Sequence, residues 1–287
     1  MILDSLHHYY NLRYGNAITA KIPRKEGSHV DTIIVSPSDD GGSSEQQASH
    51  EEIVHCHFSA IIPFTGFIGE YIPNEPSYED AVAIAFAVQH LNDGDGSIVP
   101  EIDGLDNRCK VKFSVEFADT QLQAGMALKH TLDQTSNRNR RKVSAASEND
   151  EIESKITPCA FIGAYRSAVS IPMGIVTGVL GYPQISATST SSTLDDKTQY
   201  PYFARSITPD SGNAIPIVKY LNKVLMIDHL AVLNINDAYG NAFADGLRLA
   251  AEVHAPDMMI KQTPLDVSDR GNGSIKAAII NLKSTDY

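Results

Sequence analysis

The chain has 287 residues, a formal net charge of −12 and 42% hydrophobic residues, enough apolar content for one large domain or two smaller ones with a buried core. The negative charge disfavours nucleic-acid backbones and anionic lipid, and no stretch alternates basic and aromatic residues, so nucleic-acid partners are set aside. The N-terminus shows no signal peptide, and no run approaches the roughly 18 apolar residues of a membrane-spanning helix.

Residues 1–50 show no sustained periodicity and end in a segment rich in serine, glycine and acidic residues. Such a segment has too little apolar surface to bury, so we predict a flexible leader over 1–50. From Ile53 the pattern changes, because IVHCHFSAIIPF is typical of a strand that ends at Pro63. A helix capped by Ser77 is predicted next, with apolar residues at helical spacing as far as Leu91.

Apolar and polar side chains alternate strictly in VKFSVEF, residues 111–117. This alternation indicates one wet or partly covered face, so we predict an edge strand in an otherwise buried sheet. Thr120 can cap the helix that follows. The charged stretch SNRNRRKVSAASENDEIESK comes after that helix and is predicted to be a solvated loop.

The second half of the chain repeats the order of strand and helix. Predicted strands cover CAFIG, QISAT, FARSI, HLAVLNI and MMIKQ, and predicted helices cover VSIPMGIVTGVL, the segment after Asp210 or Ser211, NAFADGLRLAAEV and SIKAAIINLK. Pro172 in the first of these helices is tolerable only in a first turn. Short apolar strands alternating with helices are typical of parallel sheets built from βαβ units, so we predict an α/β fold.

The three cysteines, Cys56, Cys109 and Cys159, are far apart in the sequence and form no CxxC pair. At most one disulfide can therefore form. Cys109 precedes one predicted strand and Cys159 another, so a bridge between them is one possibility in an oxidising compartment. Two buried free thiols are the alternative.

Motifs that would indicate an enzyme, a metal or a cofactor are missing from the sequence. No GxSxG, HExxH, GxxxxGK[ST] or GxGxxG spacing occurs. His50, His55 and His57 lie near Cys56, but Cys56 takes the opposite face of its strand from His55 and His57, so we predict no metal site. We expect a protein that is not an enzyme and has no cofactor, with a hydrolase dependent on Ser167 as the least favoured alternative.

Polar, small or aromatic residues follow several predicted strands. In open parallel sheets, ligands bind beyond the carboxyl ends of the strands, where loops and helix N-termini converge. The segments in this position are PFTG at 63–66, GAYRS at 163–167, Ser186 to Thr193, and NDAYG at 236–240. Every residue from Ser186 to Thr193 except Ala187 carries a hydroxyl group, which predicts a ligand-binding segment rather than loop filler.

From about Ile53 to its end, the chain resembles the receptor family ligand-binding region, a type I periplasmic-binding-protein fold. The motifs that carry the resemblance are IIPFTG, AIAFAVQHLND, FADTQ, FIGAYRSAVS, GYPQISATSTSSTLDDKTQYPYFARSITPD and VLNINDAYGNAFADG. Domains of this family form the extracellular part of metabotropic glutamate, GABA-B and natriuretic peptide receptors, and bacterial branched-chain amino acid binding proteins share the fold. The resemblance implies a bilobed protein with lobe 1 over 51–204 and a partial lobe 2 over 205–287.

The resemblance also implies which residues contact a ligand. Ser167 matches a serine that helps to clamp a ligand carboxylate, Thr190 matches a residue that holds a ligand amino group, and Tyr239 matches a lobe 2 tyrosine that closes over the ligand. Thr188, in the same hydroxyl run, is a further candidate. Arg166 stands where a small polar residue is commoner, and it would either meet a more acidic ligand or point into solvent.

The segment YPYFARSITPD resembles the first crossing from lobe 1 to lobe 2. Arg205 lies inside it and is expected to pair with an acidic residue, because a charge in a crossing strand needs a partner. The chain stops where another lobe 2 strand is due. We therefore expect a fragment of a receptor ectodomain or an incomplete gene model, in contact with the membrane only through a missing C-terminal part.

The function implied by the resemblance is the extracellular ligand-binding module of a membrane receptor. A small polar, amino-acid-like ligand would draw the lobes together, and the closed state would carry the signal. Pairing as a homodimer or heterodimer is expected through lobe 1. The alternative is a soluble solute-binding protein of a transport system.

Overall fold

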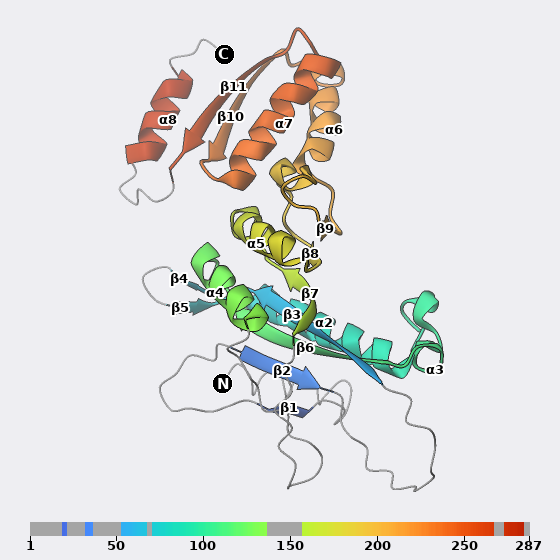
Figure 1. Ribbon diagram of the computed structural model, residues 1–287. Coiled ribbons are helices and arrows are strands. Elements are labelled where there is room, and N and C mark those ends of the chain that lie inside the picture. The colour runs from blue at the N-terminus through green and yellow to red at the C-terminus, as the bar shows by residue number, and fades with distance from the viewer. Residues whose placement is uncertain are drawn as a thin grey trace, which may run out of the picture. The chain divides into compact units, whose positions relative to one another are not determined.

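The computed structural model of the protein (Figure 1) describes residues 19–21, 32–36, 53–67, 71–136, 157–266 and 273–283. The chain divides into two compact units, Met1–Gly163 and Ala164–Tyr287. Two short strands that the sequence analysis did not predict, β1 (Thr19–Lys21) and β2 (Thr32–Ser36), fall within the range of the predicted leader. The rest of that leader and, apart from Ser136, the charged stretch over 136–155 lie outside the described residues.

Three parallel strands form the centre of the sheet in the first unit. β3 (Val54–Ile62) lies between β6 (Val111–Asp119) and β7 (Pro158–Gly163) and pairs in parallel with both. β2 pairs antiparallel with β6 on the side away from β3. The edge position predicted for β6 is therefore wrong, and Glu116, on the face expected to be wet, is only 2% exposed.

Helices cover this sheet, and a short hairpin follows β3. The elements are β4 (Thr65–Phe67), β5 (Tyr71–Pro73), α2 (Glu75–Asp93), η1 (Pro100–Ile102), α3 (Leu105–Arg108) and α4 (Ala124–Thr135). Apolar side chains of α2, β3, β6 and the turn after β3 form one core, made by Ala60, Ile62, Phe64, Ala81, Ala85, Val88, Val115 and Phe117. α2 begins earlier than predicted, since the residue before it is Asn74, whose amide donates hydrogen bonds to the Pro63 carbonyl and the Ser77 hydroxyl.

A disulfide joins the neighbouring strands β3 and β7. Its cysteines are Cys56 and Cys159, with Cα atoms 5.4 Å apart, whereas Cys109 is a free and exposed thiol. The bridge between Cys109 and Cys159 that the sequence left possible therefore does not form, and the alternative of two buried free thiols is wrong as well. The pair follows from the order of the strands, because parallel neighbours bring residues that are 103 positions apart side by side.

The second unit contains two parallel strand pairs with helices between them. β8 (Gln184–Ser186) pairs with β9 (Phe203–Arg205), and β10 (His229–Ile235) pairs with β11 (Met259–Leu265). The other elements are α5 (Ser167–Leu180), η2 (Ser192–Asp195), α6 (Asp210–Lys223), α7 (Ala238–His254) and α8 (Gly273–Lys283). α6 and α7 lie side by side (Figure 1) over a core of Ala214, Val218, Leu247, Ala250, Ala251, Ala255 and Met258. Parallel strands flanked by helices confirm the predicted α/β fold.

Pro172 departs from expectation, because it is the sixth residue of α5 and lies beyond the first turn. A proline at this point removes the N–H group that would bond to the carbonyl of Ala168. Ala168 is exposed, so water can satisfy that carbonyl. Among the helices of the described ranges, none combines the length and apolar composition needed to cross a membrane.

Candidate functional site

The hydroxyl run, Ser186 to Thr193, begins at the last residue of β8 and folds back on the loop that precedes α5. Ser186 Oγ donates to the Ala164 carbonyl at 2.8 Å, and Ser189 Oγ approaches the same carbonyl at 3.2 Å. Thr188 Oγ1 donates to the Tyr165 carbonyl at 2.6 Å. These three hydroxyls therefore bond to protein carbonyls and fix the shape of the loop.

Two serines at the start of α5 complete this link. Ser170 Oγ accepts a hydrogen bond from the Ala164 amide at 3.0 Å and lies 2.8 Å from Ser189 Oγ. Ser167 Oγ accepts one from the Ser191 amide at 3.1 Å, and Ser167 is only 1% exposed. Ser167 thus joins the first turn of α5 to the hydroxyl run, while Arg166, the residue before the helix, is exposed.

Thr190 differs from its neighbours in the run. Its hydroxyl is buried and, among the described residues, has no hydrogen-bond partner. Its carbonyl accepts a hydrogen bond from the Asp210 amide at 2.8 Å, so the run is tied to the first residue of α6. Asp210 is 2% exposed, and its Oδ2 is likewise without a partner in the described structure. A buried hydroxyl and a buried carboxylate oxygen therefore remain unsatisfied at one place.

The pKa of Asp210 is raised above its ordinary value of 3.8, chiefly because burial penalises the charged carboxylate. The nearby Thr190 hydroxyl and the positive charge of Arg205 oppose this rise. Thr190 Oγ1 is thus close enough to stabilise the carboxylate, although it does not reach the geometry of a full hydrogen bond. Asp210 was predicted only as a helix cap, and nothing in the local sequence signals its burial.

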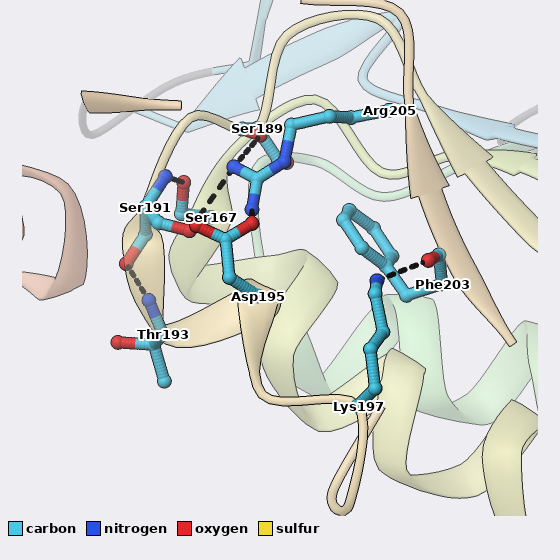
Figure 2. A network of polar contacts seen from close by, with 8 residues as sticks. All are labelled: Ser167, Ser189, Ser191, Thr193, Asp195, Lys197, Phe203 and Arg205. Atoms are coloured by element: carbon cyan, nitrogen blue, oxygen red, sulfur yellow. Dashed lines mark hydrogen bonds and ion pairs between the residues drawn. The ribbon is translucent and has the colours of Figure 1, made fainter. Parts of the chain in front are cut away.

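Arg205 holds the hydroxyl run from the other side, as Figure 2 shows. Its Nη1 donates to the carbonyls of Ser189 at 3.0 Å and Ser191 at 3.1 Å. Its Nη2 forms an ion pair with Asp195, which confirms the predicted acidic partner. The guanidinium lies 5.7 Å from the centre of the Phe203 ring, within the range of a cation–π contact.

Tyr239 lies in the first turn of α7 and is 50% exposed. Asp237 caps this helix by accepting a hydrogen bond from the Gly240 amide at 2.8 Å. The structure therefore brings Ser167, Thr188 and Thr190 together around one loop. It leaves Tyr239 and Arg166 as exposed side chains at two helix starts.

This arrangement is a candidate binding site that is built from helix starts and a fixed loop. A ligand group that donates two hydrogen bonds, such as an ammonium group, would satisfy Thr190 Oγ1 and Asp210 Oδ2 together. The first two amides of α5, at Ser167 and Ala168, have no acceptor within the helix, so they suit an anionic group.

Comparison with known proteins gives the family. The family model described as the receptor family ligand binding region matches residues 80–270, more than half of the chain. This protein belongs to that family. The matched range contains Ser167, Thr190, Asp210 and Tyr239.

The relatives found are receptors. The chain is 30% identical over 90 residues to a metabotropic glutamate receptor of Drosophila melanogaster, a match that covers 31% of this chain and 9% of that receptor. It is 35% identical over 83 residues to metabotropic glutamate receptor 6 of Oryctolagus cuniculus and of Rattus norvegicus, covering 29% of this chain and 9% of each receptor. The matched part thus spans about a tenth of the length of these relatives.

Proposed function

We propose that this chain is the extracellular ligand-binding module of a membrane receptor and that it senses a small polar, amino-acid-like ligand. The observation that carries the proposal is the pair of buried, unsatisfied oxygens on Thr190 and Asp210. Leaving a buried polar group without a partner costs about 1–3 kcal/mol, and a bound donor removes that cost. The relatives are named metabotropic glutamate receptors, so L-glutamate is the first ligand to try.

The groups of such a ligand have distinct places in this proposal. Its ammonium group binds Asp210 Oδ2 and Thr190 Oγ1, and its carboxylate binds the free amides at the start of α5. Ser167 and Thr188 act by holding the loop and the helix start in register. Arg166, exposed beside that helix start, is placed to meet a second acidic group of the ligand.

The signal in this proposal is a hinge closure of two lobes, over 51–204 and 205–287. Tyr239 closes over the bound ligand, and the protein pairs with a second receptor chain through lobe 1. The disulfide between Cys56 and Cys159 supports an extracellular location, because such bonds persist in oxidising compartments.

Calorimetric titration with L-glutamate and a panel of other amino acids tests the binding site. Thr190→Val removes the unpartnered hydroxyl, and Thr193→Val is the matched control, because Thr193 is an exposed threonine of the same run. We expect Thr190→Val to weaken binding roughly three- to tenfold and Thr193→Val to leave it unchanged. The proposal fails if no member of the panel binds the native protein, or if both variants bind like the native protein.

A further inference from the structure

Arg205 contacts the hydroxyl run on both sides of Thr190. The two carbonyls that accept hydrogen bonds from its Nη1 belong to Ser189 and Ser191, the immediate neighbours of Thr190. Fixing the carbonyls before and after a residue restricts the backbone on each side of it. The position of the Thr190 side chain therefore depends on where the Arg205 guanidinium is held.

The guanidinium is held firmly. The Arg205 side chain is 8% exposed, while that of its ion-pair partner Asp195 is 47% exposed. The planar fork of arginine can meet two carbonyls, a carboxylate and the Phe203 ring at once, which the single ammonium of a lysine cannot. A buried charge is expensive unless all of its donors find partners, so this site specifies arginine.

The other end of the same connection is Asp210. Arg205 is the last residue of β9, and Asp210 begins α6 five positions later and donates its amide to the Thr190 carbonyl at 2.8 Å. Both residues of the unsatisfied pair are thus anchored to the segment that contains Arg205.

We infer that Arg205 is a positioning residue of the ligand site, whose guanidinium fixes the loop on both sides of Thr190 so that its hydroxyl faces Asp210. The expected effect of Arg205 on ligand affinity rests on the proposed function. Its effect on the position of the loop concerns the protein without ligand and does not depend on that function. Asp195 orients the guanidinium, and Phe203 supports it from the side.

The charge of Arg205 also acts on Asp210. It lowers the pKa of this carboxyl, against the larger upward effect of burial. The charged side chains on the elements near the start of α6, Asp195 on η2 and Asp245 and Arg248 on α7, are not among the groups that shift it. Loss of the Arg205 charge should therefore raise the pH at which Asp210 takes up a proton, an effect that a purely structural role would not produce.

Hydrogen exchange of the ligand-free protein tests the positioning. Arg205→Lys keeps the charge but cannot reproduce the fork, so we expect the amides of Ser191 and Asp210 to exchange roughly fivefold faster. The Leu247 amide, in the core of α7, should keep its native rate. Arg248→Lys is the matched control, because Arg248 pairs with Glu252 on the exposed face of α7 and should change neither rate.

Two further variants complete the experiment. Asp195→Asn leaves the contacts to both carbonyls in place and should speed exchange in the run by a smaller factor, which gives a result even if Arg205→Lys does not fold. Arg205→Gln should shift the NMR titration midpoint of the Asp210 carboxyl upward. Calorimetry with L-glutamate should show weaker binding to Arg205→Lys, by roughly fivefold.

These measurements distinguish a failure of the positioning role from a failure of the proposed function. The positioning role would be overturned if the amides of the hydroxyl run exchanged at the native rate in both Arg205→Lys and Asp195→Asn. It would also be overturned if the titration midpoint of the Asp210 carboxyl were unshifted in Arg205→Gln. Faster exchange and a shifted midpoint in a native protein that binds no member of the amino acid panel would support the positioning role and overturn the proposed function instead.

Discussion

Asp210 has a carboxylate that is less stable in the folded chain than in the unfolded chain. Its pKa is raised by burial above 3.8, so the folded protein takes up the proton at a higher pH than the unfolded chain does. The ionised carboxylate therefore opposes folding at neutral pH, and this opposition fades as the pH falls through the raised pKa toward 3.8. A residue that costs stability in this way is typical of a binding site.

The Asp210→Asn variant separates the effect of this carboxylate on stability from its effect on ligand binding. We expect the variant to unfold at a higher temperature than the native protein at neutral pH, with the difference shrinking as the pH falls toward 3.8. Binding of L-glutamate should weaken roughly ten- to hundredfold, because a charge-assisted hydrogen bond is lost. Thermal unfolding over a pH series and calorimetry measure the two effects. A variant that is less stable than the native protein at neutral pH would contradict the account of Asp210.

At the residue scale, the sequence indicated which polar residues lie close together better than it indicated the contacts that each of them makes. The acidic partner of Arg205 could be predicted, because a charge in a buried strand needs a counter-charge, and Asp195 supplies it. The difference between Thr188 and Thr190 could not be predicted. Both are threonines of one hydroxyl run, and only the folded chain shows that the Thr188 hydroxyl bonds to a carbonyl while the Thr190 hydroxyl lies near the Asp210 carboxylate without a full hydrogen bond.

At the element scale, the strands and helices could be predicted, but the pairing of distant strands could not. Alternation in β6 indicated an edge strand with one wet face, yet β2 pairs with the edge of β6 that lies away from β3. That partner is the short apolar run TIIVS, which lies inside the range that was predicted to be a flexible leader. The choice of Cys56 as the partner of Cys159 has the same cause, because it depends on β3 and β7 being neighbours.

The disulfide between β3 and β7 predicts a specific loss of stability. Replacing both Cys56 and Cys159 by alanine should lower the free energy of unfolding by about 2–4 kcal/mol, since the bond closes a long loop of the unfolded chain. Cys109→Ala is the control and should change stability little, because Cys109 is exposed and unbridged. Denaturant unfolding under non-reducing conditions measures both. Equal stability of the native protein and the double variant would argue against this bridge.

At the scale of the whole molecule, the family supplies what local patterns cannot. The alternation of strands and helices indicates an α/β fold, but many unrelated functions share such folds. Membership of the receptor family ligand-binding region supports a ligand-binding role. The unsatisfied pair at Thr190 and Asp210 then favours a ligand with a positively charged donor group.

Lobe closure can be tested through Tyr239. Tyr239→Ala should leave unfolding of the ligand-free protein almost unchanged, because the side chain is 50% exposed, but should weaken L-glutamate binding and the compaction that small-angle scattering detects on binding. Tyr220→Ala is the matched control, since Tyr220 is a tyrosine of α6 that is 54% exposed. If Tyr239→Ala and Tyr220→Ala compacted equally on binding, Tyr239 would have no role in lobe closure.

The most direct measurement is a crystal structure of the protein with the tightest-binding amino acid of the panel. We expect the ligand's ammonium nitrogen to lie within about 3 Å of both Asp210 Oδ2 and Thr190 Oγ1. A ligand bound with its ammonium group turned away from these two oxygens, or bound at another place on the chain, would contradict it.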